Sequence, residues 1–292
     1  MKSWKKALFF TILAGFLWGT SFPAIKIGLG FIDAYTFAFL RFSLAFVIMF
    51  IVLLLTKNLD INLAKKKSLW YLGILNGFAY LLQFVGMTYT TASKSSLFVN
   101  LSAVWVAILS WFILKEKFDN KKLSGIILAV IGVFLITTNL ELSSLTQGMI
   151  YGDALILLSG FAWAFFIIYN KKIISDSKNT GQLMTWVLLG TVLPLIPFLV
   201  FSTNLSLNLP TEAWLAILYT VLCAIAPYYL WLKGLKDMSP VTSTIILLVE
   251  PIVAIVISFL ILKEGFNLIY GIGALLILLA ILLVSFKKQK PK

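Results

Sequence analysis

Long apolar stretches recur along almost the whole chain and are separated by short segments that carry lysine, asparagine, proline or glycine. Each stretch has about 20 residues, which is the length of helix that crosses a hydrocarbon core of about 30 Å. We therefore expect an all-α integral membrane protein with ten transmembrane helices. The expected spans are residues 7–28, 34–55, 68–90, 95–114, 121–139, 151–170, 181–201, 211–232, 239–262 and 267–286.

Basic residues fall mainly on alternate loops between these expected spans. If the amino terminus is cytoplasmic, 20 of the 24 Lys and Arg residues lie in segments on the cytoplasmic side. Cytoplasmic loops of membrane proteins carry such an excess, so the pattern places both termini in the cytoplasm, in the plasma or inner membrane. The basic residues that do not follow it are Lys26, Arg41, Lys94 and Lys263.

The composition excludes several classes of protein. With 61% hydrophobic and 12% charged residues, the chain has more apolar surface than a soluble domain of 292 residues could bury. The formal net charge of +13 is explained by membrane orientation, so we expect no nucleic-acid partner. Because the chain has no histidine, a single cysteine and no phosphate-binding GxxxxGK[ST] motif, we expect no metal, no cofactor and no internal ATP site.

The second half of the chain repeats features of the first half. Residues 91–118 run parallel to residues 240–266, and both segments end in Leu-Lys-Glu-x-Phe. A second match sets residues 14–28 beside residues 159–174 and aligns Trp18 with Trp163. We therefore predict two five-helix repeats, residues 1–142 and 143–292. Because five is an odd number, the repeats would be inverted around a central cavity, an arrangement that favours alternating access.

Five short segments, spread in order over nearly the whole chain, form a recognisable pattern. The segments are FLWGTSFPAIKIG at 16–28, FLRF at 39–42, YTTAS at 89–93, GDALILLSGFAWA at 152–164 and LVEPIVAIVISFLILKE at 248–264. Together they resemble the EamA branch of the drug/metabolite transporter superfamily. The resemblance implies ten helices around a central cavity and a carrier of small metabolites, often an exporter of amino acids or related compounds.

Glu250 is an acidic residue about halfway along the ninth expected span, directly before Pro251. A carboxylate at this depth is costly unless it is paired, protonated or exposed to water. One interpretation is that Glu250 lines the central site, where it binds a substrate amine or carries a coupling proton. The other is that it caps backbone groups freed by Pro251.

Arg41 is the only arginine, about seven residues inside the outer end of the second expected span. At 1.5 Å per residue it lies roughly 10 Å deep, within reach of the outer surface if its side chain snorkels. A structural or snorkelling role is therefore one interpretation. The others are a charge pair with Glu250 and a contact with a substrate carboxylate.

Further candidates for the cavity wall are aromatic and polar residues in the middle of spans. Trp18 and Trp163 either face each other across the cavity or belong to ordinary helix packing. Mid-span polar side chains need partners inside the protein, and this applies to Tyr80, Gln83, Asn100 and Tyr228.

These features favour a secondary transporter over two other classes. A lipid-modifying membrane enzyme would need clustered acids, histidines or a nucleophile with its base, and a non-transporting assembly protein would not need polar residues at mid-membrane depth. We expect a non-enzyme whose partners are a small-molecule substrate and membrane lipid. Coupling to protons, exchange of solutes and transport down a simple gradient are the open alternatives for its energy source. A monomer suffices, because one chain holds both halves.

Overall fold

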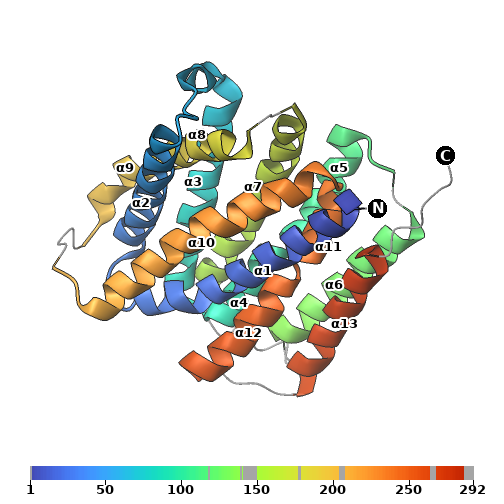
Figure 1. Cartoon of the computed structure of the whole chain (residues 1–292). Coiled ribbons are helices and arrows are strands. Elements are labelled where there is room, and N and C mark those ends of the chain that lie inside the picture. The colour runs from blue at the N-terminus through green and yellow to red at the C-terminus, as the bar shows by residue number, and fades with distance from the viewer. Residues whose placement is uncertain are drawn as a thin grey trace.

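A computed structural model describes residues 2–117, 119–138, 140, 150–176, 179–203, 208–263 and 268–285. Throughout these ranges the regular elements are helices, and no strand is found among them (Figure 1). Five of the lysines that support the predicted orientation lie outside the described residues: Lys178, Lys287, Lys288, Lys290 and Lys292.

The helices of residues 2–138 follow the predicted apolar stretches closely. The predicted fourth span is divided into two helices, and a short 3-10 helix connects the second and third spans. The elements are α1 (Lys2–Gly28), α2 (Ala34–Leu55), η1 (Ile61–Lys65), α3 (Lys67–Thr88), α4 (Ala92–Asn100), α5 (Ser102–Leu114) and α6 (Asn120–Thr138).

The helices of residues 150–285 repeat this order. The predicted ninth span is again divided, and the predicted seventh span is interrupted at Leu193 and Pro194 and ends in a short 3-10 helix that begins at Leu199. The elements are α7 (Ile150–Asp176), α8 (Thr180–Val192), α9 (Leu195–Phe198), η3 (Leu199–Phe201), α10 (Thr211–Lys236), α11 (Pro240–Leu247), α12 (Val249–Leu262) and α13 (Leu268–Ser285).

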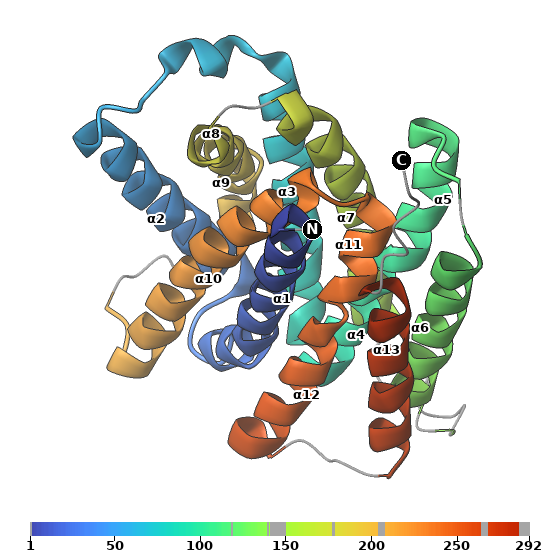
Figure 2. The same ribbon diagram turned by 45° about the vertical axis from the view of Figure 1, so that its right-hand side comes forward.

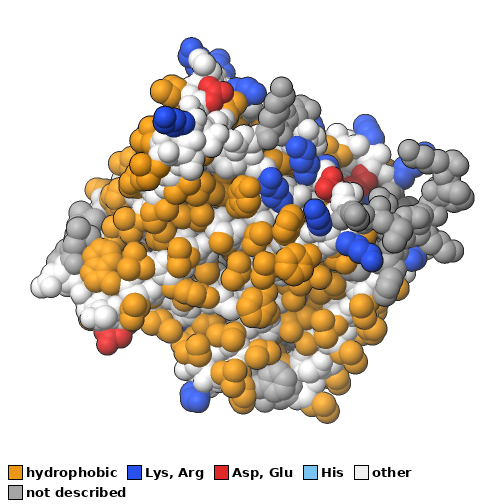
Figure 3. All heavy atoms as spheres, in the orientation of Figure 1, with side chains coloured by type: hydrophobic (Ala, Val, Ile, Leu, Met, Phe, Trp, Pro, Cys, Tyr) orange, Lys and Arg blue, Asp and Glu red, His pale blue; other side chains and the backbone are white. Residues whose placement is uncertain are grey.

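Eight helical stretches of the described residues are long and apolar enough to cross a membrane, and they coincide with eight of the ten predicted spans. The two other predicted ranges coincide with α6 and α13, of which α13 contains a shorter apolar stretch, Leu268–Val284. Hydrophobic side chains cover most of the face in Figure 3, and lysine side chains gather mainly toward its top and its upper right part. This is the surface expected of an integral membrane protein.

The two divided helices break for different local reasons. At Leu248, between α11 and α12, the Leu248 N–H donates to the carbonyl of Ile245, three residues earlier, at 3.2 Å. Three residues further on, Pro251 has no N–H to donate to the hydrogen bonds of the helix. At Leu101, between α4 and α5, no proline is present. Here the Asn100 side chain donates to the Ser96 carbonyl at 2.8 Å, and such side-chain bonds compete with regular helix.

The helices pack in matching pairs. On one side, α1 contacts α10 and the divided helix α11–α12. On the other side, α7 makes the corresponding contacts with α3 and with the divided helix α4–α5. α2 packs against α8, and α6 lies beside α13, as Figure 2 shows. At Gly15 and Gly160 the backbones of α1 and α7 come close to the two helix breaks. The breaks are therefore held in the interior of the bundle, where neighbouring helices cover their backbone groups.

Candidate functional site

A cavity lies between the two helix breaks and is lined by side chains from both halves of the chain. The centre of a water-sized molecule can occupy about 60 Å³ of it, several times the roughly 10–15 Å³ that one water needs. It therefore has room for several waters or part of a small metabolite. The lining residues are Trp18, Ser21, Phe22, Arg41, Tyr80, Gln83, Val99, Asn100, Ser102, Trp163, Ile167, Trp231, Thr244, Leu247 and Glu250.

Glu250 stands in the first turn of α12 and lines this cavity. Its side chain is 7% exposed, and Asn100 Nδ2 donates to Glu250 Oε1 at 2.9 Å. This bond joins the two divided helices, because Asn100 ends α4. No backbone donor among the described residues bonds to the Glu250 carboxylate, so the structure gives no support to the capping interpretation.

Arg41 lies in α2 and lines the same cavity. Its guanidinium carbon is 5.2 Å from the ring centres of Phe42 and Tyr80 and 5.4 Å from that of Phe84, within cation–π distance of all three. The side chain is only 1% exposed, so the snorkelling interpretation is wrong. The aromatic rings cover the charge and keep it inside the bundle.

Arg41 and Glu250 form no ion pair with each other. The ion pairs found within the described ranges join Lys94 to Asp153 at 2.7 Å and Lys122 to Glu116. Both charged residues of the cavity are therefore inside the protein, and neither has an oppositely charged partner among the described residues.

Trp18 and Trp163 both line the cavity and extend into a cluster of aromatic rings. The Trp18 ring is 6.0 Å from that of Trp231, and the Trp163 ring is 4.8 Å from that of Tyr80. The indole N–H groups of Trp18 and Trp163 are buried and have no hydrogen-bond partner in the part of the chain that the structure describes, whereas Trp231 Nε1 donates to Ser243 Oγ at 3.0 Å. Two matching tryptophans thus each leave a donor unused beside the cavity.

The other predicted site residues divide between the wall and the shell behind it. Tyr80, Gln83 and Asn100 line the cavity, but Tyr228 is not among the lining residues. The Tyr228 hydroxyl donates to Asn170 Oδ1 at 3.4 Å, and its ring lies 6.0 Å from that of Trp231. Tyr228 therefore supports the wall from behind.

The lining contains residues for which the sequence offers little signal. Apolar residues that face a cavity look like those that face lipid, and Trp231 stands two residues before Lys233, where a tryptophan is typical of a membrane interface. The lining residues that were not predicted are Ser21, Phe22, Val99, Ser102, Ile167, Trp231, Thr244 and Leu247.

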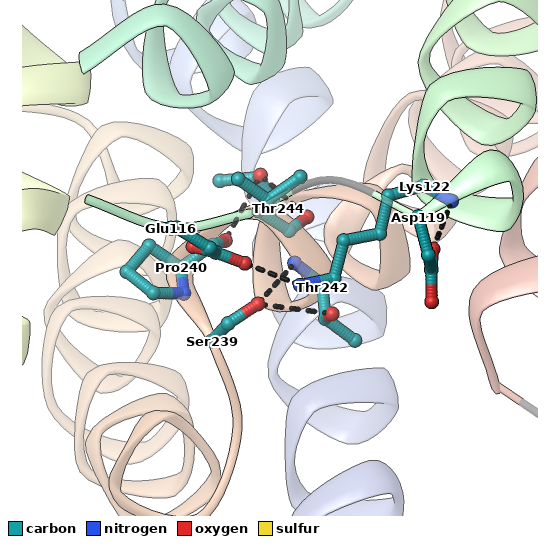
Figure 4. A network of polar contacts seen from close by, with 8 residues as sticks. Glu116, Asp119, Lys122, Ser239, Pro240, Thr242 and Thr244 are labelled. Carbon is teal, nitrogen blue, oxygen red and sulfur yellow. Dashed lines mark hydrogen bonds and ion pairs between the residues drawn. The ribbon is translucent and has the colours of Figure 1, made fainter. Parts of the chain in front are cut away.

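A polar network at the start of α11 sets the position of one lining residue (Figure 4). Ser239 caps the helix by accepting a bond from the Thr242 backbone N–H at 3.3 Å, and Pro240 occupies the first turn. The hydroxyl of Thr244 donates to the carbonyls of Pro240 at 3.1 Å and Val241 at 3.0 Å. Thr244 thus uses its donor within α11, and its hydroxyl oxygen can act toward the cavity only as an acceptor.

The site has the character of a binding cavity for an organic molecule. Where side chains are described, no group of three or more His, Cys, Asp or Glu residues is placed to hold a metal ion. The lining combines large aromatic rings with a few polar groups, which is the usual make-up of a small-molecule site.

Comparison with known proteins places the chain among transporters. The family model described as "EamA-like transporter family" matches residues 5–138 and 150–286. An uncharacterized transporter of Archaeoglobus fulgidus is 29% identical over 284 residues, which is 94% of this chain and 95% of that protein. A protein of Escherichia coli named "Probable amino-acid metabolite efflux pump" is 29% identical over 91% of this chain and 90% of its own length.

A solved crystal structure has the same fold. It matches with a TM-score of 0.77 and covers 95% of this chain and 96% of its own, at 14% sequence identity. At this identity the match establishes the arrangement of helices alone.

Proposed function

Because the chain belongs to the EamA-like transporter family, we propose that it is a secondary carrier that moves a small metabolite across the membrane by alternating access. The proposed substrate is an amino acid or a related amphipathic compound, and the proposed direction is export. The observation that carries this proposal is the cavity between the two helix breaks, with Glu250 in its wall. The name of the Escherichia coli relative supports both the substrate class and the direction.

We further propose that residues 1–142 and 143–292 are inverted repeats with five transmembrane helices each, so that α6 and α13 also cross the membrane. The family model matches once in each half, and the matched helix pairs described above fit a two-fold relation between the halves. We place both termini in the cytoplasm on the lysine pattern. The monomer is the proposed functional unit, because the cavity is complete within one chain.

Alternating access requires a contact that closes each end of the cavity in turn. Lys26 Nζ donates to the carbonyls of Met87 at 2.7 Å and Thr90 at 2.6 Å, around the carboxyl end of α3. Lys171 Nζ donates to the carbonyls of Leu235 at 2.9 Å and Lys236 at 3.0 Å, at the carboxyl end of α10. Figure 1 shows α3 and α10 ending at opposite ends of the bundle. We propose that Lys26 closes the outer end and Lys171 the cytoplasmic end.

Removing one of these contacts is expected to shift the carrier toward the state that is open on that side. With Ser21→Cys placed in the cavity wall of a Cys223→Ser background, Lys26→Met should raise labelling from outside by about fivefold, the shift produced by about 1 kcal/mol. Lys171→Met should lower it. The measurement is the rate of modification by a membrane-impermeant maleimide in intact cells.

The control for this experiment is Lys172→Met, which removes the charge of an exposed lysine next to Lys171. It should leave the labelling rate unchanged. Equal labelling rates in the Lys26 and Lys171 variants would show that these contacts do not set the open side.

The carrier itself is tested by reconstituting the purified protein in liposomes. Uptake of a panel of labelled amino acids and related metabolites is followed with and without a proton gradient. We expect saturable uptake of at least one compound, and a change of rate with the gradient would identify protons as the coupling ion. Absence of saturable uptake across the panel would contradict the proposed function.

The family and the named relatives are transporters, which supports the prediction that this protein is not an enzyme. Neither the lipid-modifying enzyme nor the assembly protein gains support from a specific observation of the described residues. Both are therefore left without a separate proposal.

A further inference from the structure

We propose that Arg41 binds a carboxylate group of the transported compound, an inference that rests on the proposed carrier function. The argument begins with the state of its charge. Its Nε and Nη1 atoms, which carry three of the five guanidinium N–H donors, are buried, and no residue in the described part of the chain accepts a hydrogen bond from them. A buried charge without a counter-ion is among the least favourable arrangements in a protein interior, so a ligand group that completes it is expected.

The rings around Arg41 do not supply the missing partner. Phe42, Tyr80 and Phe84 stabilise the cation through their faces, but a ring face does not replace the in-plane acceptors that the N–H groups need. The rings instead hold the guanidinium in place. The side chain is thereby oriented before a ligand arrives, which reduces the entropy that binding must overcome.

Among the described residues, the buried side-chain polar atoms of the lining that have no hydrogen-bond partner are all donors. The N–H groups of Trp18 and Trp163 are unpartnered, as are Nε and Nη1 of Arg41. Glu250 is the one acidic residue in the lining, and its Oε1 already accepts from Asn100. An acceptor-rich anionic group would complement this excess of donors better than a neutral or cationic one.

The shape of the guanidinium further restricts the kind of anionic group that the ligand carries. Its planar fork matches the two oxygens of a carboxylate, with which arginine forms paired, charge-assisted hydrogen bonds. Glu250 would be the obvious internal carboxylate, but it is bonded to Asn100 and forms no ion pair with Arg41. The carboxylate is therefore assigned to the ligand.

The test compares carboxylates with their uncharged carboxamides. Purified protein is titrated with L-leucine against L-leucinamide, L-phenylalanine against L-phenylalaninamide, and 4-methylvalerate against 4-methylvaleramide, and dissociation constants are measured by ligand-induced thermal stabilisation. The wild type should bind at least one carboxylate about tenfold or more tightly than its carboxamide, the usual scale for a charge-assisted pair. Arg41→Gln should bind both members of that pair equally.

Two further variants make the result specific. Arg41→Lys keeps the charge but loses the fork, so it should show a carboxylate preference at least threefold smaller than that of the wild type. It also decides the question if Arg41→Gln does not fold. Lys172→Gln removes an exposed positive charge outside the cavity lining and should keep the full preference.

Three outcomes would overturn the assignment. They are a wild type that prefers no carboxylate in the panel, a preference that persists in Arg41→Gln, and a preference that is unchanged in Arg41→Lys. The liposome assay separates this question from the proposed function. Uptake that is confined to compounds without a carboxylate would contradict the role of Arg41 and still support the carrier function. Carboxylate binding without any uptake would contradict the carrier function and still support binding by Arg41.

Discussion

Replacement of Glu250 by glutamine is expected to lower saturable uptake in liposomes by at least about tenfold. The glutamine side chain fills the same space but carries no negative charge and takes up no proton. A charged hydrogen bond to a ligand contributes roughly 1.5–3 kcal/mol, which corresponds to about tenfold to hundredfold in affinity. Initial uptake rates of the best panel substrate, measured over a range of concentrations, give the comparison.

The matched control is Glu212→Gln, which removes the same charge from an exposed position in the first turn of α10. Its uptake should equal that of the wild type. Glu250→Gln should also unfold at a similar temperature, because an amide oxygen can still accept the bond from Asn100. If Glu250→Gln transports as fast as Glu212→Gln, the carboxylate has no part in transport.

Replacement of Gly73 by leucine is expected to prevent normal folding. At this position α3 crosses α8, and a Cβ atom on Gly73 would lie 2.4 Å from the Cα of Gly190 and 2.7 Å from the carbonyl oxygen of Val187. Both are backbone atoms, so the helices themselves would have to separate. Overpacking of this kind costs about 1–3 kcal/mol and more where the backbone must move. The measurement is the yield and thermal stability of the monomeric peak in detergent.

Gly271→Leu provides the control, because a Cβ atom on Gly271 of α13 has no atom within 4 Å. Both substitutions replace a helical glycine by the same good helix former, so their intrinsic effect on the helix is alike. The difference between them is therefore the close contact alone. Similar yields and unfolding temperatures for the two variants would contradict the tight crossing of α3 and α8.

The spans were predictable because bilayer thickness imposes a length on apolar stretches, whereas the break at Leu101 was not. Pro251 follows Glu250 and is a sequence signal for an irregular helix, whereas the break between α4 and α5 has no proline and is accompanied by a bond from the Asn100 side chain to the Ser96 carbonyl. That choice depends on the neighbouring helices that bury the break. The sequence shows that a polar side chain lies within an apolar span, but it does not show whether the helix is continuous or broken at that position.

The same distinction explains the cavity wall. We predicted Asn100, Gln83 and Glu250 as lining residues because a polar side chain in the membrane interior is costly unless it has a partner or faces a cavity. Trp231 was missed and Tyr228 was placed in the wall because the sequence does not say which face of α10 points inward. Arg41 was considered for the outer surface on depth alone, and only the packing of three aromatic rings around it places the guanidinium inside.

The hydrogen bond between Asn100 and Glu250 also bears on how fast a carrier can reorient. It joins a residue of the first proposed half to one of the second, so the carboxylate already has a protein partner in the opposite half. A ligand ammonium that binds Glu250 would compete with Asn100 and loosen this connection. We therefore expect the carrier to reorient faster with substrate bound than without it. Exchange of substrate between the two sides of the membrane should then be faster than net transport in one direction.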